Sequence, residues 1–142
     1  MQYVVAVDGS TEADQAVAYA ATHAAGLGAD LEVVHVVEPE TELIDGEIVL
    51  PGADRATDIG EQVLNRARQR ASDAVGDRDD LETDTTLLTG RPSDAIADYA
   101  DRAGADAIYL GHRGLSAERE QVVGSVAKSV VDKATVPVTI IR

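Results

Sequence analysis

The sequence predicts an α/β protein built on an open sheet of parallel strands. Apolar runs of strand length alternate along the chain with segments in which apolar residues recur at helical spacing, the pattern of strands joined by helices. The run at 31–37 is almost continuously apolar, as expected of a strand whose two faces are both covered. The five expected strands are residues 3–7, 31–37, 83–88, 107–110 and 136–141.

Four helices are expected between these strands. In the first helix, alanines and a valine fall on one face, and Gly26 and Gly28 are expected to end it. Pro92 suits the first turn of a later helix because its missing N–H has no intrahelical partner there. The second, third and fourth helices are expected over about 59–75, 92–103 and 125–133.

An acidic segment, residues 38–56, separates the second strand from the second helix. It contains Pro39, Pro51 and a short apolar patch at 48–50. Connections of this length inside a compact domain are uncommon and are often functional. We expect a lid or a variable insertion here.

Length and composition restrict the classes of protein to which the chain can belong. A chain of 142 residues fits one domain, residues 1–142, which buries roughly two-thirds of the surface that its unfolded form exposes. The absence of cysteine excludes a disulfide framework, a thiolate metal site and a cysteine nucleophile. The first residues lack the pattern of a signal peptide, and no apolar run approaches the ~20 residues of a membrane span. We expect a cytoplasmic protein with no membrane partner.

The charge balance is strongly acidic. Acidic residues number 26 and basic residues 12, a formal net charge of -14, and only Lys128 and Lys133 are lysines. A nucleic-acid partner is disfavoured because duplex binding depends on Lys and Arg that neutralise phosphates. Many aspartates, few lysines and small core residues are typical of proteins that work in concentrated salt, which screens repulsion between carboxylates. We therefore expect a halophilic protein.

Two glycine-containing turns follow strands of the predicted sheet. Open parallel sheets bind ligands outside the carboxyl ends of their strands, where the strand order reverses. The first strand leads into residues 8–11 (DGST), and the fourth leads into 111–114 (GHRG), followed by nine residues and then Gly124. Glycine lets backbone amides approach phosphate oxygens, and the helix start after Gly124 offers unpaired N–H groups. Ser125 either caps this helix or donates its hydroxyl to a phosphate.

The spacing of these glycines carries a resemblance to a known family. Gly111, two residues, Gly114, nine residues, then Gly124 and Ser125 match the pattern of the ATP-binding members of the universal stress protein family. The segments 4–10, 35–37 and 124–138 are also similar to that family, so the resemblance covers nearly the whole chain. The chain lacks the Walker loop and the GxGxxG fingerprint, which are different phosphate motifs.

The resemblance implies a Rossmann-like fold and an ATP site. The fold would be a three-layer α/β/α open sheet of five parallel strands in the order 3-2-1-4-5. Asp8 would lie by the ribose or adenine, the backbone of Val36 would read the adenine edge, and the glycine segments would surround ribose and phosphates. Mg²⁺ or Mn²⁺ would be held mainly by the phosphates, with no protein metal site. The expected cofactor-binding residues are Asp8, Gly9, Ser10, Val36, Gly111, Arg113, Gly114, Gly124, Ser125 and Val126.

Several of these residues also have a purely structural interpretation. Asp8 could be a turn residue before a helix cap at Ser10 or Thr11, and the three glycines of the pattern could serve turns and a helix cap without any ligand. His35, in an apolar strand, is expected to be a hydrogen-bonded core residue, whereas the role of His112 stays open.

Three functions remain to be distinguished. The leading hypothesis is a nucleotide-dependent binding or signalling module with an unknown protein partner, acting as a homodimer through residues 136–141. That segment is an apolar edge strand of the kind another chain often covers, and the resemblance also implies pairing there. The second is a slow ATPase or a phosphoryl- or adenylyl-transferring enzyme. No catalytic set is found for it beyond Asp8, Arg113 and Arg119. The third is a relative that has lost its nucleotide.

Overall fold

The computed structural model describes residues 1–38, 42–44, 47–49, 53–76, 80–112 and 123–142. The main sheet has five parallel strands in the spatial order β5-β2-β1-β6-β7, which is 3-2-1-4-5 along the chain when these five are counted. The predicted fold class and strand order are therefore confirmed. The strands are β1 (Gln2–Ala6), β2 (Asp30–Val37), β5 (Thr83–Thr89), β6 (Ala107–Gly111) and β7 (Val138–Ile141).

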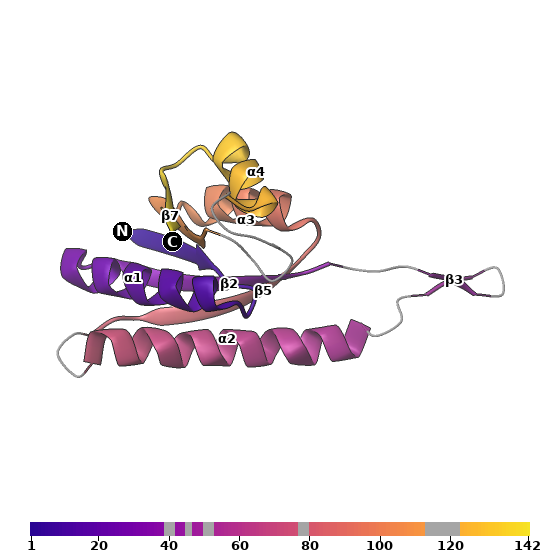
Figure 1. Ribbon diagram of the computed structural model, residues 1–142, viewed down its shortest axis with the longest axis horizontal. Helices are drawn as coiled ribbons and strands as arrows, with labels where there is room; N and C mark the ends of the chain where they lie inside the picture. Colours follow the sequence, from indigo (N-terminus) through magenta and orange to yellow (C-terminus); the bar gives the residue numbers. More distant parts are fainter. Residues whose placement is uncertain (39–41, 45–46, 50–52, 77–79, 113–122) are drawn as a thin grey trace.

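Helices cover both faces of this sheet, which gives three layers (Figure 1). Two helices pack together on one face and two on the other, as the two separate core clusters show. The first pair is α1 (Thr11–Leu27) and α2 (Ala53–Val75), and the second is α3 (Pro92–Ala103) and α4 (Ser125–Lys133).

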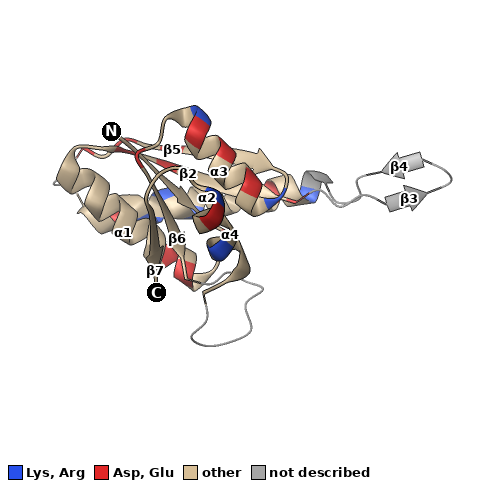
Figure 2. Ribbon diagram, turned by 90° about the horizontal axis from the view of Figure 1, so that it is seen from above, with Lys and Arg blue, Asp and Glu red and all other residues tan. Residues whose placement is uncertain are grey.

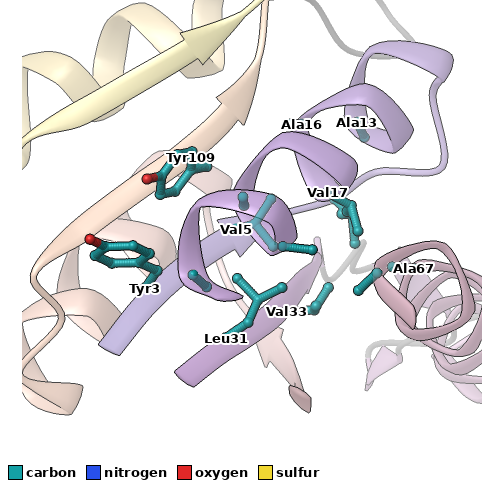
Figure 3. Packing of buried hydrophobic residues seen from close by; sticks show 14 of the residues in the cluster. Tyr3, Val5, Ala13, Ala16, Val17, Leu31, Val33, Ala67 and Tyr109 are labelled. Carbon is teal, nitrogen blue, oxygen red and sulfur yellow. The ribbon is translucent and has the colours of Figure 1, made fainter. Parts of the chain in front are cut away.

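The core follows the alternation of side chains along the strands. Val5 of β1 packs in the cluster under α1 and α2, and its neighbour Val4 packs in the cluster under α3 and α4. Figure 3 shows Val5, Val17 and Val33 gathered where α1 meets the strands. The buried face of α1 is mostly alanine, which lets this helix lie close to the sheet.

The ends of α1 show how local sequence fixes the helix. Ser10 is the N-cap, and its Oγ accepts the backbone N–H of Ala13 at 3.1 Å. Gly28 ends the helix at φ 68°, a left-handed conformation that glycine adopts readily. The expectation that Gly26 also ends the helix was wrong, because Gly26 lies inside it.

The connection after β2 differs from its prediction. It contains a two-stranded antiparallel hairpin, β3 (Glu42–Ile44) and β4 (Glu47–Val49), and α2 already begins at Ala53. The segment therefore contains short strands of its own. Its expected role as a lid concerns residues that lie partly outside the described ones.

The last strand is shorter than predicted. β7 begins at Val138 instead of residue 136, because Pro137 has no N–H to donate to a ladder, although its carbonyl accepts the N–H of Ile108 at 2.9 Å. None of the helices in the described parts of the chain is long and apolar enough to cross a membrane.

Candidate functional site

A cavity of about 380 Å³ lies at the carboxyl ends of the central strands. It is bounded by the ends of β1, β2 and β6 and by the first turns of α3 and α4, at the point where the strand order reverses. Both turns selected from the sequence contribute to it. Its lining includes Ala6, Val7, Asp8, Ser10, Ala13, Val36, Glu38, Pro92, Ile96, Leu110, Gly111, His112, Gly124, Ser125, Val126 and Ala127.

The turn after β1 is held by its own side chains. Asp8 Oδ1 accepts the backbone N–H of Ser10 at 2.9 Å, and Ser10 in turn caps α1. Gly9 has φ 88°, a backbone conformation that favours glycine at this position. The structural interpretation of Asp8 as a turn residue is therefore correct. Asp8 also lines the cavity, as the functional interpretation requires.

Gly111 is required for the packing of α1. A Cβ at this position would lie 2.9 Å from the backbone carbon of Glu12 and 3.0 Å from its carbonyl oxygen. The first glycine of the sequence pattern therefore lets the first turn of α1 approach the end of β6. This contact places the turn at Asp8 and the loop after β6 at the same cavity.

The start of α4 forms part of the cavity wall. Gly124 is the N-cap at φ -62° and ψ 158°, and as a glycine it has no side chain with which to cap the helix. Ser125 is the first residue of the helix, so the expectation that it could cap the helix was wrong. The first backbone N–H groups of a helix have no intrahelical partner and carry partial positive charge. Residues 124–127 line the cavity, so this helix start is suited to an anion.

The rest of the lining is largely apolar. Val36 contributes from β2, Leu110 from β6 and Ile96 from α3. A flat aromatic ring fits such a surface better than a charged group does, because burying an unpaired charge is costly.

Two carboxylates are the only acidic side chains of the described lining. These are Asp8 and Glu38, and no Lys or Arg occurs among the described lining residues. Arg113 and Gly114, which were predicted to take part, lie outside the described residues. Among the parts that the structure describes, no group of three or more His, Asp or Glu residues could hold a metal ion.

The structure therefore brings most of the predicted residues to one cavity. Asp8, Ser10, Val36, Gly111, Gly124, Ser125 and Val126 line it, whereas Gly9 serves the turn. The sequence interpretation missed Glu38, Pro92 and Ile96. The rule that ligands bind at the carboxyl ends of strands could have found them, because Glu38 directly follows β2 and the other two lie in the first turns of α3.

Two histidines near the cavity differ in their environment. His35 Nδ1 lies 2.7 Å from the carbonyl oxygen of Val7, which confirms the expected hydrogen bond, although His35 is half-buried and lies outside the core clusters. His112 lines the cavity and is 5% exposed. Its Nε2 is buried and has no hydrogen-bond partner in the described part of the chain.

Fold and cavity define an open-sheet α/β protein with a concave site where the strand order reverses. The sequence model of the Universal stress protein family matches residues 2–142, nearly the whole chain. A universal stress protein of Thermus aquaticus, named for its position 3′ of a QAH/OAS sulfhydrylase gene, is 36% identical over 139 residues, 98% of this chain and 96% of that protein. The chain thus belongs to the universal stress protein family.

Two similar solved structures contain an adenine nucleotide. The universal stress protein of Archaeoglobus fulgidus in complex with dAMP is 29% identical, with a TM-score of 0.75 and coverage of 100% of this chain and 98% of that chain. A universal stress protein in complex with cAMP is 26% identical, with a TM-score of 0.74 and coverage of 100% and 96%.

Proposed function

We propose that the protein binds an adenine nucleotide, ATP, in this cavity and acts as a nucleotide-dependent binding or signalling module in a stress response. One observation carries the proposal: the uncapped start of α4 forms the wall of a cavity whose lining is otherwise largely apolar. Such a helix start binds phosphate through backbone N–H groups, and an apolar slot accepts a base.

Each part of the nucleotide has a matching group in the cavity. The phosphates bind the backbone amides at Ser125 and Val126 and the Ser125 hydroxyl. Gly124, whose own N–H is donated to the His112 carbonyl, lets the phosphates approach the helix start. Arg113 adds a charge-assisted hydrogen bond. The Asp8 carboxylate accepts hydrogen bonds from the ribose or the adenine, and the backbone of Val36 pairs with the adenine edge. Mg²⁺ or Mn²⁺ accompanies ATP as a counter-ion held mainly by its phosphates.

The two nucleotide-bound relatives support this assignment. Their ligands, dAMP and cAMP, share an adenine and one phosphate. The apolar part of the cavity lining suits the adenine, and the start of α4 suits the phosphate. The extension to ATP rests on the glycine spacing from Gly111 to Ser125.

A binding role agrees with the chemistry of the cavity better than a catalytic one. Phosphoryl transfer needs a positioned nucleophile, cationic groups that stabilise the developing charge, and usually a held metal. The described lining supplies carboxylates and backbone amides, and its charged groups are Asp8 and Glu38. We propose that occupancy of the cavity is read by a protein partner.

The assembly proposed is a homodimer of single-domain chains in the cytoplasm. β7 lies at the edge of the sheet, and its outer backbone groups have no strand beside them among the described residues. Its residues are half-buried and apolar apart from Thr139. A second β7 pairing with this edge would satisfy those groups and cover the strand.

The proposal is tested by identifying what the purified protein carries. The native protein is denatured and the released small molecules are analysed by mass spectrometry, with ATP added back to stripped protein and turnover measured. We expect an adenine nucleotide and negligible turnover. No nucleotide and no rebinding would overturn the proposal, and a turnover near ~1 s⁻¹, the lower end for ordinary enzymes, would favour the enzymatic alternative.

A further inference from the structure

His112 is fixed between the edge of the sheet and the start of α4. Its backbone N–H donates to the carbonyl of Ile141 at 2.6 Å, and its own carbonyl accepts the N–H of Gly124 at 2.8 Å. The residue therefore lies at the junction of β7, β6 and the helix start that is suited to an anion. Both backbone bonds restrain the position from which its side chain extends.

The imidazole of His112 lies on the face of the sheet that borders the cavity. The position before it, Gly111, faces α1, since a Cβ there would meet Glu12. Successive residues of a strand alternate between faces, so His112 shares the face of Leu110, and both line the cavity together with residues 124–127.

This imidazole differs from the other two in the chain. Nδ1 of His35 bonds to the Val7 carbonyl, and Nδ1 of His23 lies 3.0 Å from the Tyr109 hydroxyl. His112 is the most buried of the three, and its Nε2 has no partner in the described ranges. A buried polar nitrogen without a hydrogen bond is energetically unfavourable. A ligand group that forms the missing hydrogen bond with this nitrogen would therefore be bound preferentially.

We infer that His112 takes up a proton when a phosphate group binds at the start of α4, which couples nucleotide affinity to pH. This inference rests on the proposed function of the same cavity. The phosphate dianion stabilises the imidazolium form and supplies an acceptor for the added N–H. Nε2 gains the proton from solvent, and no other bond forms or breaks.

The charged side chains that line the cavity beside His112 are carboxylates in the described part of the chain. Asp8 and Glu38 line the same cavity, and Glu12 lies against Gly111 from α1. Lys128 of α4 and Arg142 after β7 belong to packed elements but do not line the cavity. The described residues of the cavity wall therefore provide no Lys or Arg side chain for a phosphate. A protonated His112 would be the first cationic side chain in this part of the wall.

The coupling is measured by titration calorimetry of ATP in two buffers with different ionisation enthalpies at pH 7.0–7.5. The difference in heat between buffers gives the number of protons taken up on binding. Adenosine, which lacks phosphate, is the ligand control. His112→Gln keeps a neutral hydrogen-bonding side chain, and His23→Gln removes an exposed histidine outside the cavity as the matched protein control.

Wild type and His23→Gln are expected to take up a fraction of a proton with ATP and none with adenosine. His112→Gln is expected to take up less, and its ATP affinity should lose a pH dependence of up to about tenfold per pH unit. The phosphate itself titrates at about pH 6 and contributes equally to all three proteins, so their difference isolates His112.

Four results would contradict the inference. ATP binding without proton uptake by wild type would overturn it and leave the proposed function intact. The same uptake in His112→Gln, or with adenosine, would also overturn it. Failure of wild type to bind ATP at any pH would overturn the proposed function and this inference together. If His112→Gln does not fold, His112→Asn takes its place in the same comparison.

Discussion

The phenol of Tyr99 donates a hydrogen bond of 2.9 Å to the buried carboxylate of Glu32, which joins α3 to the middle of the sheet. Thr86 of β5 donates a second, short hydrogen bond to the same carboxylate oxygen. Glu32 is 4% exposed, so its charge depends on these donors for the interactions that water would otherwise provide. Because α3 also forms a wall of the cavity through Pro92 and Ile96, this cluster helps to hold the site in shape.

Removal of the Tyr99 hydroxyl should therefore destabilise the fold. Tyr99→Phe leaves a buried carboxylate with one donor fewer, and we expect the free energy of unfolding to fall by about 1.5 to 3 kcal/mol, the range for a hydrogen bond to a charged group. Urea denaturation measures the change. Tyr19→Phe, on the outer part of α1, should change stability by less than about 0.5 kcal/mol. Equal effects of the two substitutions would show that the contact with Glu32 contributes little.

Stability should also fall at alkaline pH. Burial raises the pKa of Tyr99 and of Tyr109 above the ordinary value of 10.0. The unfolded chain therefore releases these protons at a lower pH than the folded chain, so their contribution is fully present below about pH 10 and is lost as the pH rises through the folded pKa. Denaturation midpoints measured between pH 8 and pH 12 should fall above pH 10. Tyr109→Phe should show a shallower fall, and an unchanged fall in this variant would contradict the assignment to Tyr109.

Salt should stabilise the protein. The formal net charge is -14, and Figure 2 shows acidic residues recurring along α3. Screening reduces this repulsion more than it weakens exposed ion pairs such as Lys133 with Asp94, because exposed pairs contribute little to stability. We expect the thermal midpoint to rise from dilute buffer to molar KCl. A flat or falling midpoint would remove the proposal that the protein is halophilic.

The proposed dimer makes a separate prediction. Light scattering in molar KCl should give twice the chain mass of 14.9 kDa at tens of micromolar protein. The carbonyls of Pro137 and Ile141 accept N–H groups of β6 and of the residue that follows it, so the backbone groups of the alternate residue Ile140 face the outer edge. Ile140→Pro would therefore remove an outward-facing N–H from β7 and should shift the mass toward the monomer. Monomeric wild-type protein at this concentration would overturn pairing through β7.

The alternation of strands and helices and the position of the cavity could be predicted because the sequence carries strong local signals. The apolar run of β2, the glycine turns after β1 and β6, and the helix start at Ser125 all have physical causes that act within a few residues. The resemblance to a family supplied the strand order. The first and last residues of a strand could be predicted less precisely. In β7, Pro137 cannot donate to the ladder and so shortens the strand, and the periodicity of apolar residues does not reveal this local effect.

Other features depend on contacts between distant segments and could not be predicted. The approach of Glu12 to Gly111 and the partners of Glu32 arise only when α1, β5 and α3 pack on the sheet. In the sequence Glu32 stands as one polar residue in an apolar run. The hairpin β3–β4 was missed because its strands are short.

Gly124 offers the most direct test of nucleotide binding. Its φ of -62° and ψ of 158° are accessible to any residue, so a side chain there need not strain the fold. Gly111 is less suitable, because a Cβ there would collide with α1. Gly124→Val places a branched side chain where the phosphates approach the helix start, while Arg113→Ala removes a single charged donor.

The deciding measurement is a calorimetric titration of ATP into wild type, Gly124→Val and Arg113→Ala in molar KCl with magnesium, with circular dichroism confirming that each is folded. We predict that wild type binds, that Arg113→Ala loses about 1 to 3 kcal/mol of binding free energy, and that Gly124→Val loses more. A folded Gly124→Val protein that binds ATP as tightly as wild type would contradict the proposed site.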